Sequence, residues 1–129
     1  MATLDIAPLL GRTFIKVENI DNECVRFTAD DGYTVELKHE QDCCERVYLE
    51  DVTGDLSDLA GATIVRAEET TSEVETGEYG DISMWTFYNI SSVKGSVTLR
   101  FCGSSNGYYS ISVHVVVDGE RWWGNVKSI

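Results

Sequence analysis

Short segments in which apolar and polar residues alternate cover most of the chain, and turn-forming residues separate them. Alternation with a period of two places apolar side chains on one face of a strand. The pattern predicts one mainly β domain over residues 1–129, an antiparallel barrel or roll of about eight short strands with one or two short helical turns. The predicted strands are 13–18, 24–29, 33–39, 46–52, 64–69, 84–90, 97–102 and 108–117, with a last short strand after Gly119.

The strongest hairpin signal is Asp30-Asp-Gly32, which lies between two alternating segments. Asp-Gly tolerates the positive φ angles that a tight turn between antiparallel strands needs. In the returning strand, His39 continues the alternation of Val35 and Leu37. We therefore expect His39 to share a face with these two apolar residues.

A helical turn is predicted at residues 55–61, where it would plug an opening of the barrel. Asp55 is suited to the N-cap, Asp58 occupies the third position as in a capping box, and Gly61 closes the end. Residues 1–11 are expected to cap one end of the core. Residues 68–81 carry acidic residues and no basic one, which is typical of a solvated loop or hairpin tip.

The aromatic residues are assigned mostly to the core by alternation. Two adjacent rings on a strand cannot both face inward, so Trp122 and Trp123 must divide between the two faces. One of them is then exposed beside acidic loops, as in a protein-binding hot spot, or packs under the N-terminal segment. The other aromatic residues in this assignment are Trp85, Phe87, Tyr108 and Tyr109.

Acidic side chains outnumber basic ones, 22 to 10, and the formal net charge is −12. Nucleic-acid and anionic membrane surfaces are bound through Lys and Arg, so direct binding to either is not expected. The charge serves solubility, or it forms a surface that engages a basic protein groove as a nucleic-acid mimic would.

No apolar run reaches the roughly 20 residues of a membrane span, and the first residues lack the basic region and apolar core of a signal peptide. We therefore expect a cytoplasmic protein. Its four cysteines, Cys24, Cys43, Cys44 and Cys102, are then expected to be thiols. Adjacent cysteines on extended backbone point to opposite faces and do not readily close on each other.

Several strings together resemble a known family. They are Phe27–Tyr33, His39–Val52, Gly54–Leu59, Trp85–Tyr88 and Ser105–Ser110, and the most distinctive is His-Glu-Gln-Asp-Cys-Cys-Glu at 39–45. They resemble a family of small uncharacterised proteins, a domain of unknown function common in bacteriophage and prophage genomes. The resemblance runs over about residues 23–117. It implies a phage-encoded accessory protein made inside a bacterium, and it transfers no activity and no functional residue.

The segment 39–45 supplies the ligand types of a zinc site, in His39, Asp42, Cys43 and Cys44. Its spacing differs from the C-x2-C turns of structural zinc, and Cys24 and Cys102 complete a site only if the fold brings them near. Buried structural thiols are the alternative. A cysteine nucleophile with His39 or His114 as base is disfavoured, because acidic neighbours raise a thiol's pKa.

Glu50, Asp51, Asp55 and Asp58 offer oxygen ligands for a hard cation, but their spacing matches no EF-hand loop. Helix capping explains two of these carboxylates without a metal. A glycosidase carboxylate pair would require a cleft that the sequence does not indicate.

The sequence therefore predicts a protein without enzymatic activity and without a cofactor, which binds a host protein with a basic surface. A host defence or nucleic-acid-handling machine is the expected target. The alternatives are a small-ligand or metal-binding β-barrel that sequesters a signalling molecule, and a minor virion component. The candidate partner-binding residues are Glu40, Asp42, Glu45, Glu68, Glu69, Glu73, Glu75, Glu78, Trp122 and Trp123.

Overall fold

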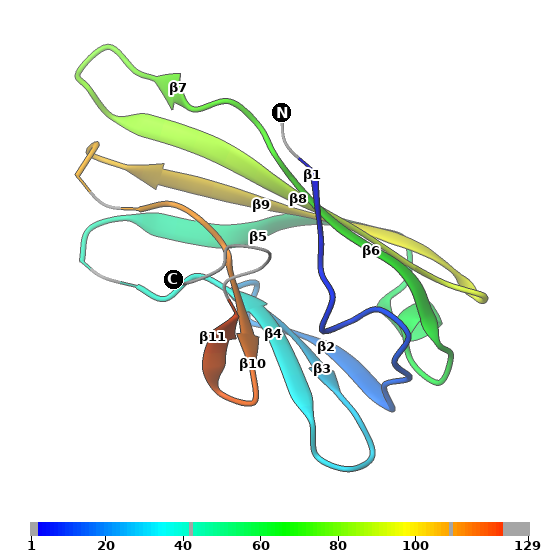
Figure 1. Cartoon of the computed structure of the whole chain (residues 1–129). Coiled ribbons are helices and arrows are strands. Elements are labelled where there is room, and N and C mark those ends of the chain that lie inside the picture. The colour runs from blue at the N-terminus through cyan, green and yellow to red at the C-terminus, as the bar shows by residue number, and fades with distance from the viewer. Residues whose placement is uncertain (1–2, 42, 109, 123–129) are drawn as a thin grey trace.

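The computed structural model describes residues 3–41, 43–108 and 110–122, and it confirms that the chain is mainly β (Figure 1). These residues form eleven strands in two antiparallel sheets, together with one 3-10 helix, η1 (Leu56–Leu59). Within the same ranges, no helix has the length and apolar character needed to cross a membrane.

The larger sheet has the order β1-β6-β8-β9-β5, and β7 pairs with β8. Its centre is the long hairpin of β8 and β9, which pair from Ile82↔Ser105 to Ser92↔Gly95. Both strands extend beyond the predicted segments 84–90 and 97–102. The strands of this sheet are β1 (Thr3–Asp5), β5 (Arg46–Thr53), β6 (Ile64–Thr71), β7 (Glu75–Thr76), β8 (Ile82–Ser92) and β9 (Gly95–Ser105).

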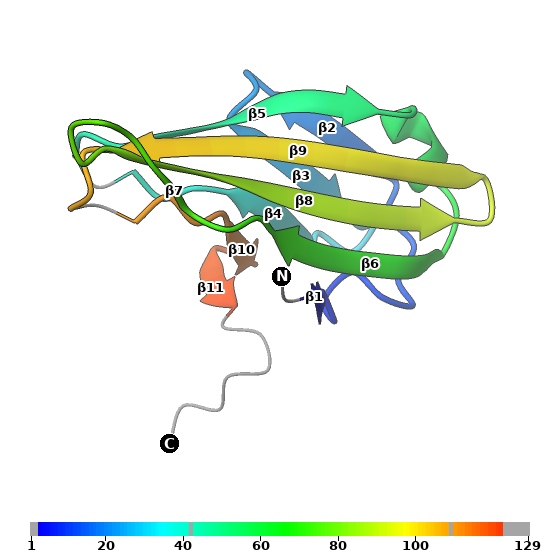
Figure 2. The same cartoon turned by 90° about the horizontal axis from the view of Figure 1, so that it is seen from above.

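The smaller sheet has the order β11-β10-β4-β3-β2 and lies beneath the larger one (Figures 1 and 2). Barrel closure requires a continuous ring of paired strands. Here the terminal strands of each order do not pair with one another, so the described residues contain no closed barrel. The chain passes between the two sheets after β1, β4 and β9. The strands of this sheet are β2 (Lys16–Ile20), β3 (Cys24–Thr28), β4 (Thr34–Lys38), β10 (His114–Val117) and β11 (Glu120–Trp122).

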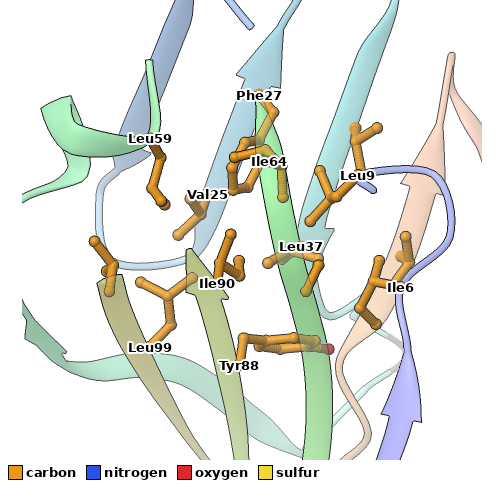
Figure 3. Packing of buried hydrophobic residues seen from close by; sticks show 14 of the residues in the cluster. Ile6, Leu9, Val25, Phe27, Leu37, Leu59, Ile64, Tyr88, Ile90 and Leu99 are labelled. Carbon is orange, nitrogen blue, oxygen red and sulfur yellow. The ribbon is translucent and has the colours of Figure 1, made fainter. Parts of the chain in front are cut away.

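The hydrophobic core fills the space between the inner faces of the two sheets (Figure 3). Leu59 of η1 closes one side, and Ile6 and Leu9 of the N-terminal segment cover another. Burial of these side chains supplies the main driving force for packing the sheets together. Other buried core residues are Val25, Phe27, Leu37, Ile64, Tyr88, Ile90 and Leu99.

Turn chemistry fixes both hairpins of the smaller sheet. The predicted turn before β4 is confirmed, with Gly32 at a φ of 91° and a hydrogen bond from Ala29 N–H to the Tyr33 carbonyl oxygen at 2.8 Å. Between β2 and β3, Asp21 and Asn22 adopt φ angles of 54° and 58°. Asp and Asn enter this left-handed region more readily than other side chains, so two short polar residues suffice to reverse the chain.

The assignment of Trp85 and Phe87 to the core is wrong. Tyr88 and Ile90 of β8 face inward and are fully buried, whereas Trp85 and Phe87 are half-buried on the opposite face of the strand. Either face of an alternating strand can turn toward the core, so the size of the Trp85 ring does not decide which face is buried. In β8 the buried face carries Tyr88 and Ile90, which pack in the core together with Leu99.

The predicted acidic loop begins later than expected. β6 continues through residues 68–71, where Glu68 pairs in register with Asn89 and Glu69 with Tyr88. The exposed connection is therefore shorter than 68–81. At the N-terminus, residues 7–11 form the expected turn, but Thr3–Asp5 forms an unpredicted edge strand on β6.

Candidate functional site

The segment 39–45 connects β4 to β5, and a buried pair of side chains holds both of its ends. The prediction that His39 faces inward with Leu37 is confirmed, since the His39 side chain is only 3% exposed and Leu37 is fully buried. Glu45, immediately before β5, has a side chain with no exposed surface. Glu45 was a candidate partner-binding residue, but the structure places it inside the protein.

The hydrogen bonds of His39 specify where its protons lie. Its Nδ1 lies 2.7 Å from the carbonyl oxygen of Ser112, and its Nε2 lies 2.7 Å from Oε2 of Glu45. A carbonyl oxygen only accepts, so Nδ1 carries a proton. Two unprotonated acceptors would repel each other at the second contact, so a further proton lies between Nε2 and Glu45. The ring is therefore fixed on both sides.

Glu45 also organises the connection itself. Its Oε1 accepts the backbone N–H of Cys43 at 2.8 Å, and the side-chain amide of Gln41 donates to the Cys43 carbonyl oxygen at 3.1 Å. A buried carboxylate is tolerated only when its charge and lone pairs are satisfied. His39, the Cys43 backbone N–H and the Gln41 amide meet that requirement for Glu45.

A second group of polar side chains lies next to this pair. His114 of β10 stacks on His39 with ring centroids 5.3 Å apart, and its Nδ1 accepts the backbone N–H of Glu40 at 3.1 Å. Arg121 of β11 pairs with the Glu40 carboxylate at 3.0 Å, and this pairing lowers the pKa of Glu40. Desolvation, with the charges of Arg121 and His39, lowers the pKa of His114. The His114 imidazole is therefore held in its neutral form.

These residues border a polar pocket of about 390 Å³ between the β4–β5 connection and the β10–β11 hairpin. Gln41, Ser110, His114 and Arg121 contribute to its walls. A concave site with converging polar groups and a perturbed histidine has the features of a ligand-binding pocket.

The structure corrects the expectation that all four cysteines are free thiols. Cys43 and Cys44 are joined by a disulfide. Both residues lie in a bend, where the strand alternation of side chains does not apply. Cys24 of β3 and Cys102 of β9 belong to different sheets. Within the described part of the chain, no three His, Cys, Asp or Glu side chains are placed to hold a metal ion; Asp42 lies outside it.

Two of the four carboxylates considered for a hard cation, Glu50 and Asp55, make other contacts. Glu50 pairs with Arg100 at 2.8 Å. The predicted N-cap is confirmed, since Asp55 accepts the backbone N–H of Ser57 at 2.9 Å, and its bonds with Ser57 lower its pKa. The carboxylate of Asp58 lies against Gly95.

The remaining candidate residues occupy different environments. Glu68 pairs with Arg66, whereas Glu69 is half-buried and accepts the hydroxyl of Tyr88 at 2.6 Å. Trp122 is half-buried against the core, and Trp123 lies outside the described residues. Three candidate glutamates are exposed on the connection between β6 and β8; they are Glu73, Glu75 and Glu78.

Two exposed tyrosines were missed by sequence reasoning. Tyr79 is 91% exposed in the connection between β7 and β8, and Tyr108 is 88% exposed after β9. A Cβ atom on Gly107 would lie 2.9 Å from the carbonyl oxygen of Gly80, so the two connections touch. Alternation assigned Tyr108 to a strand, but the Asn106-Gly107 turn signal beside it indicated a loop.

Comparison with protein families identifies the family of the chain. The family described as Domain of unknown function (DUF7448) matches residues 7–115. Neither the curated proteins nor the solved structures contain a match to the chain.

Proposed function

Since the chain belongs to the Domain of unknown function (DUF7448) family, whose description assigns no activity, we propose that it is a phage-encoded accessory protein that binds a host protein. It acts without catalysis, in the bacterial cytoplasm, through one end of the β-sandwich. We call this end the tyrosine end; it comprises residues 72–81 and 106–108.

The observation that carries the proposal is the pair of exposed rings of Tyr79 and Tyr108 on two touching connections. In both Figure 1 and Figure 2, the β7–β8 connection and the end of β9 lie at the same end of the sandwich. Exposed tyrosine contributes nothing to the core, but tyrosine is enriched among the residues that dominate binding energy at protein interfaces. This end therefore has the aromatic anchors of a binding surface.

The charge of the tyrosine end supports a partner with a basic surface. The connection carries Glu73, Glu75, Glu78 and Asp81, all exposed, and no Lys or Arg occurs in the sequence from 67 to 93. Within the described part of the chain, none of these four carboxylates forms an ion pair. A complementary basic surface would accelerate association and select the correct partner. A host defence or nucleic-acid-handling protein, with a basic groove for nucleic acid, meets this requirement.

The proposal is tested by affinity purification from a phage-infected bacterium with the tagged chain as bait. Replacement of both tyrosines, Tyr79→Ala with Tyr108→Ala, should weaken partner binding by about thirtyfold, the loss that corresponds to about 2 kcal/mol at a hot spot. Val93→Ala is the matched control, because Val93 is 82% exposed in the β8–β9 turn at the opposite end.

A second variant set tests the role of charge. Replacing Glu73, Glu75 and Glu78 with Gln should slow association at low salt and reduce its dependence on ionic strength. The proposal would be contradicted if the double tyrosine variant captured the partner as well as the wild type does. It would also be contradicted if no partner were captured at any ionic strength.

Small-ligand binding is the second candidate function, and the polar pocket beside His114 and Arg121 favours it. Native mass spectrometry of freshly purified protein tests this candidate. A copurified ligand that is lost in Arg121→Gln but kept in the double tyrosine variant would support it over the first.

A further inference from the structure

The Cys43–Cys44 pair is the part of the 39–45 segment that neither the fold nor the proposed function explains. A disulfide stabilises a fold mainly by closing a long loop in the unfolded chain. Adjacent residues enclose no intervening chain, so this bond adds little of that kind. Both residues are exposed, and they contribute nothing to the core. The pair is therefore better explained by its chemistry than by stability.

The backbone that carries the two sulfur atoms is held in place from beneath. Cys43 N–H donates to Glu45, whose buried carboxylate is in turn bound to His39. Gln41 donates to the Cys43 carbonyl oxygen. These contacts involve only the backbone atoms of Cys43. The two sulfur atoms contact each other and lie at the surface. The connection thus presents a preorganised pair of sulfurs.

The other two cysteines are in the opposite situation. Cys24 is buried and donates to Glu36, and desolvation together with the Glu36 charge raises its pKa to about 12. Cys102 is half-buried in a strand, and desolvation raises its pKa. Both thiols are therefore poor ligands for an ion in solution. They serve as internal controls for the exposed pair.

We propose that the reduced Cys43–Cys44 pair is a binding site for soft, thiophilic ions, with trivalent arsenic as the chemical type. Soft ions select thiolate ligands. Because the two sulfurs reach each other, they can also reach one shared atom. Trivalent arsenic with one organic substituent needs only two thiolates, whereas structural zinc needs four ligands, and the described residues offer no such set.

The binding step is balanced without an oxidant. A small dithiol first reduces the disulfide to two thiols, supplying two electrons and two protons, and is itself oxidised to a disulfide. An arsenical of the form R–As=O then forms two As–S bonds, and both thiol protons leave with the oxygen as one water molecule. Arsenic keeps its oxidation state throughout.

The test uses the full chain, reduced and freed of reductant, with phenylarsine oxide as the probe and mass spectrometry as the readout. One arsenical should bind per chain, resist an excess of a monothiol, and be released by a small dithiol. Cys43→Ser or Cys44→Ser should each weaken binding by about 100-fold, because two linked contacts become one. Cys24→Ser and Cys102→Ser should bind as the wild type does.

Serine keeps the Cys43 backbone N–H, so both variants of the pair should fold, and a thermal unfolding curve checks this. Monothiol-resistant binding that survives either Cys43→Ser or Cys44→Ser would overturn the proposal. So would binding that disappears in a folded Cys24→Ser or Cys102→Ser variant, or a wild-type chain that takes up no arsenical.

Discussion

Glu45 and Glu69 are two carboxylates withdrawn from solvent in different ways. Glu45 has no exposed side-chain surface, and it is paired with His39 and accepts the Cys43 backbone N–H. Glu69 is half-buried in β6 and has a neutral donor, the hydroxyl of Tyr88. Desolvation raises the pKa of Glu69 despite that hydrogen bond. The surroundings of Glu45 compensate its charge, whereas the surroundings of Glu69 mainly disfavour the charged form.

The difference shows what each carboxylate contributes. At the β4–β5 connection, the carboxylate is the structural centre, since the ring of His39 and the backbone of the loop are both bound to it. In β6, strand pairing with β8 already fixes the backbone around Glu69. Loss of the Glu45 carboxylate should therefore disrupt the β4–β5 connection. Loss of the Glu69 charge should remove a desolvation cost and leave the strand intact.

The largest effect is expected for Glu45→Ala. This change removes the acceptor of the buried His39 ring and of the Cys43 backbone N–H. It should lower the free energy of unfolding by about 3–5 kcal/mol. Urea denaturation measures the loss. Glu75→Ala, at an exposed glutamate of the same chain, should change stability by less than about 0.5 kcal/mol.

A double-mutant cycle with His39→Ala and Glu45→Ala separates the pair from its surroundings. The coupling free energy should reach about 2 kcal/mol, because each single change strands the other group. Additive effects would show that the two side chains act independently and that Glu45 is not the structural centre of the connection.

A smaller effect of opposite sign is expected for Glu69→Gln. The amide oxygen still accepts the Tyr88 hydroxyl, and no charge is buried, so stability at neutral pH should be unchanged or higher by up to about 1 kcal/mol. The folded protein holds the Glu69 proton more tightly than the unfolded chain does. Wild-type stability should therefore decline relative to the variant as pH rises above 4.5, measured by thermal unfolding at several pH values.

Equal stability differences between wild type and Glu69→Gln at every pH would contradict the assigned environment of Glu69. Glu68→Gln is the matched control, because Glu68 precedes Glu69 in β6 and its carboxylate pairs with Arg66 instead of a tyrosine hydroxyl.

Another small effect concerns His114, which stacks on His39 and borders the polar pocket. Its pKa is lowered, so the unfolded chain binds the proton more readily. Stability should therefore fall by no more than about 1 kcal/mol as pH drops from 6.5 toward the lowered pKa, and His114→Gln should remove this dependence. An unchanged pH profile in that variant would show that His114 does not contribute.

The sequence located the strands better than it located the site. The turn at 30–32 and the cap at Asp55 follow from local backbone chemistry and were predictable. The inward face of His39 followed from strand alternation. Its partner Glu45 was assigned to the surface, because nothing in the local sequence distinguishes a carboxylate that will meet a buried imidazole from one in solvent.

Long-range contacts explain the other differences. The exposed pair Tyr79 and Tyr108 depends on two connections that touch only after β8 and β9 have paired. The Ser112 carbonyl oxygen that fixes His39 comes from a segment far along the chain. No pattern within a short window contains either relationship.

By itself, the sequence determined that the chain is mainly β, the approximate positions of nine of the eleven strands, and how the tight turn at 30–32 reverses the chain. These features depend on φ angles and on alternation within a few residues. The sequence did not predict β1 or β7, and the strand predicted at 108–117 is only His114–Val117. Only the tertiary structure decided that the strands form two sheets, that β8 presents Tyr88 inward rather than Trp85, and that Glu45 is buried. Those outcomes depend on which distant surfaces fill the same space, and packing is a property of the whole chain.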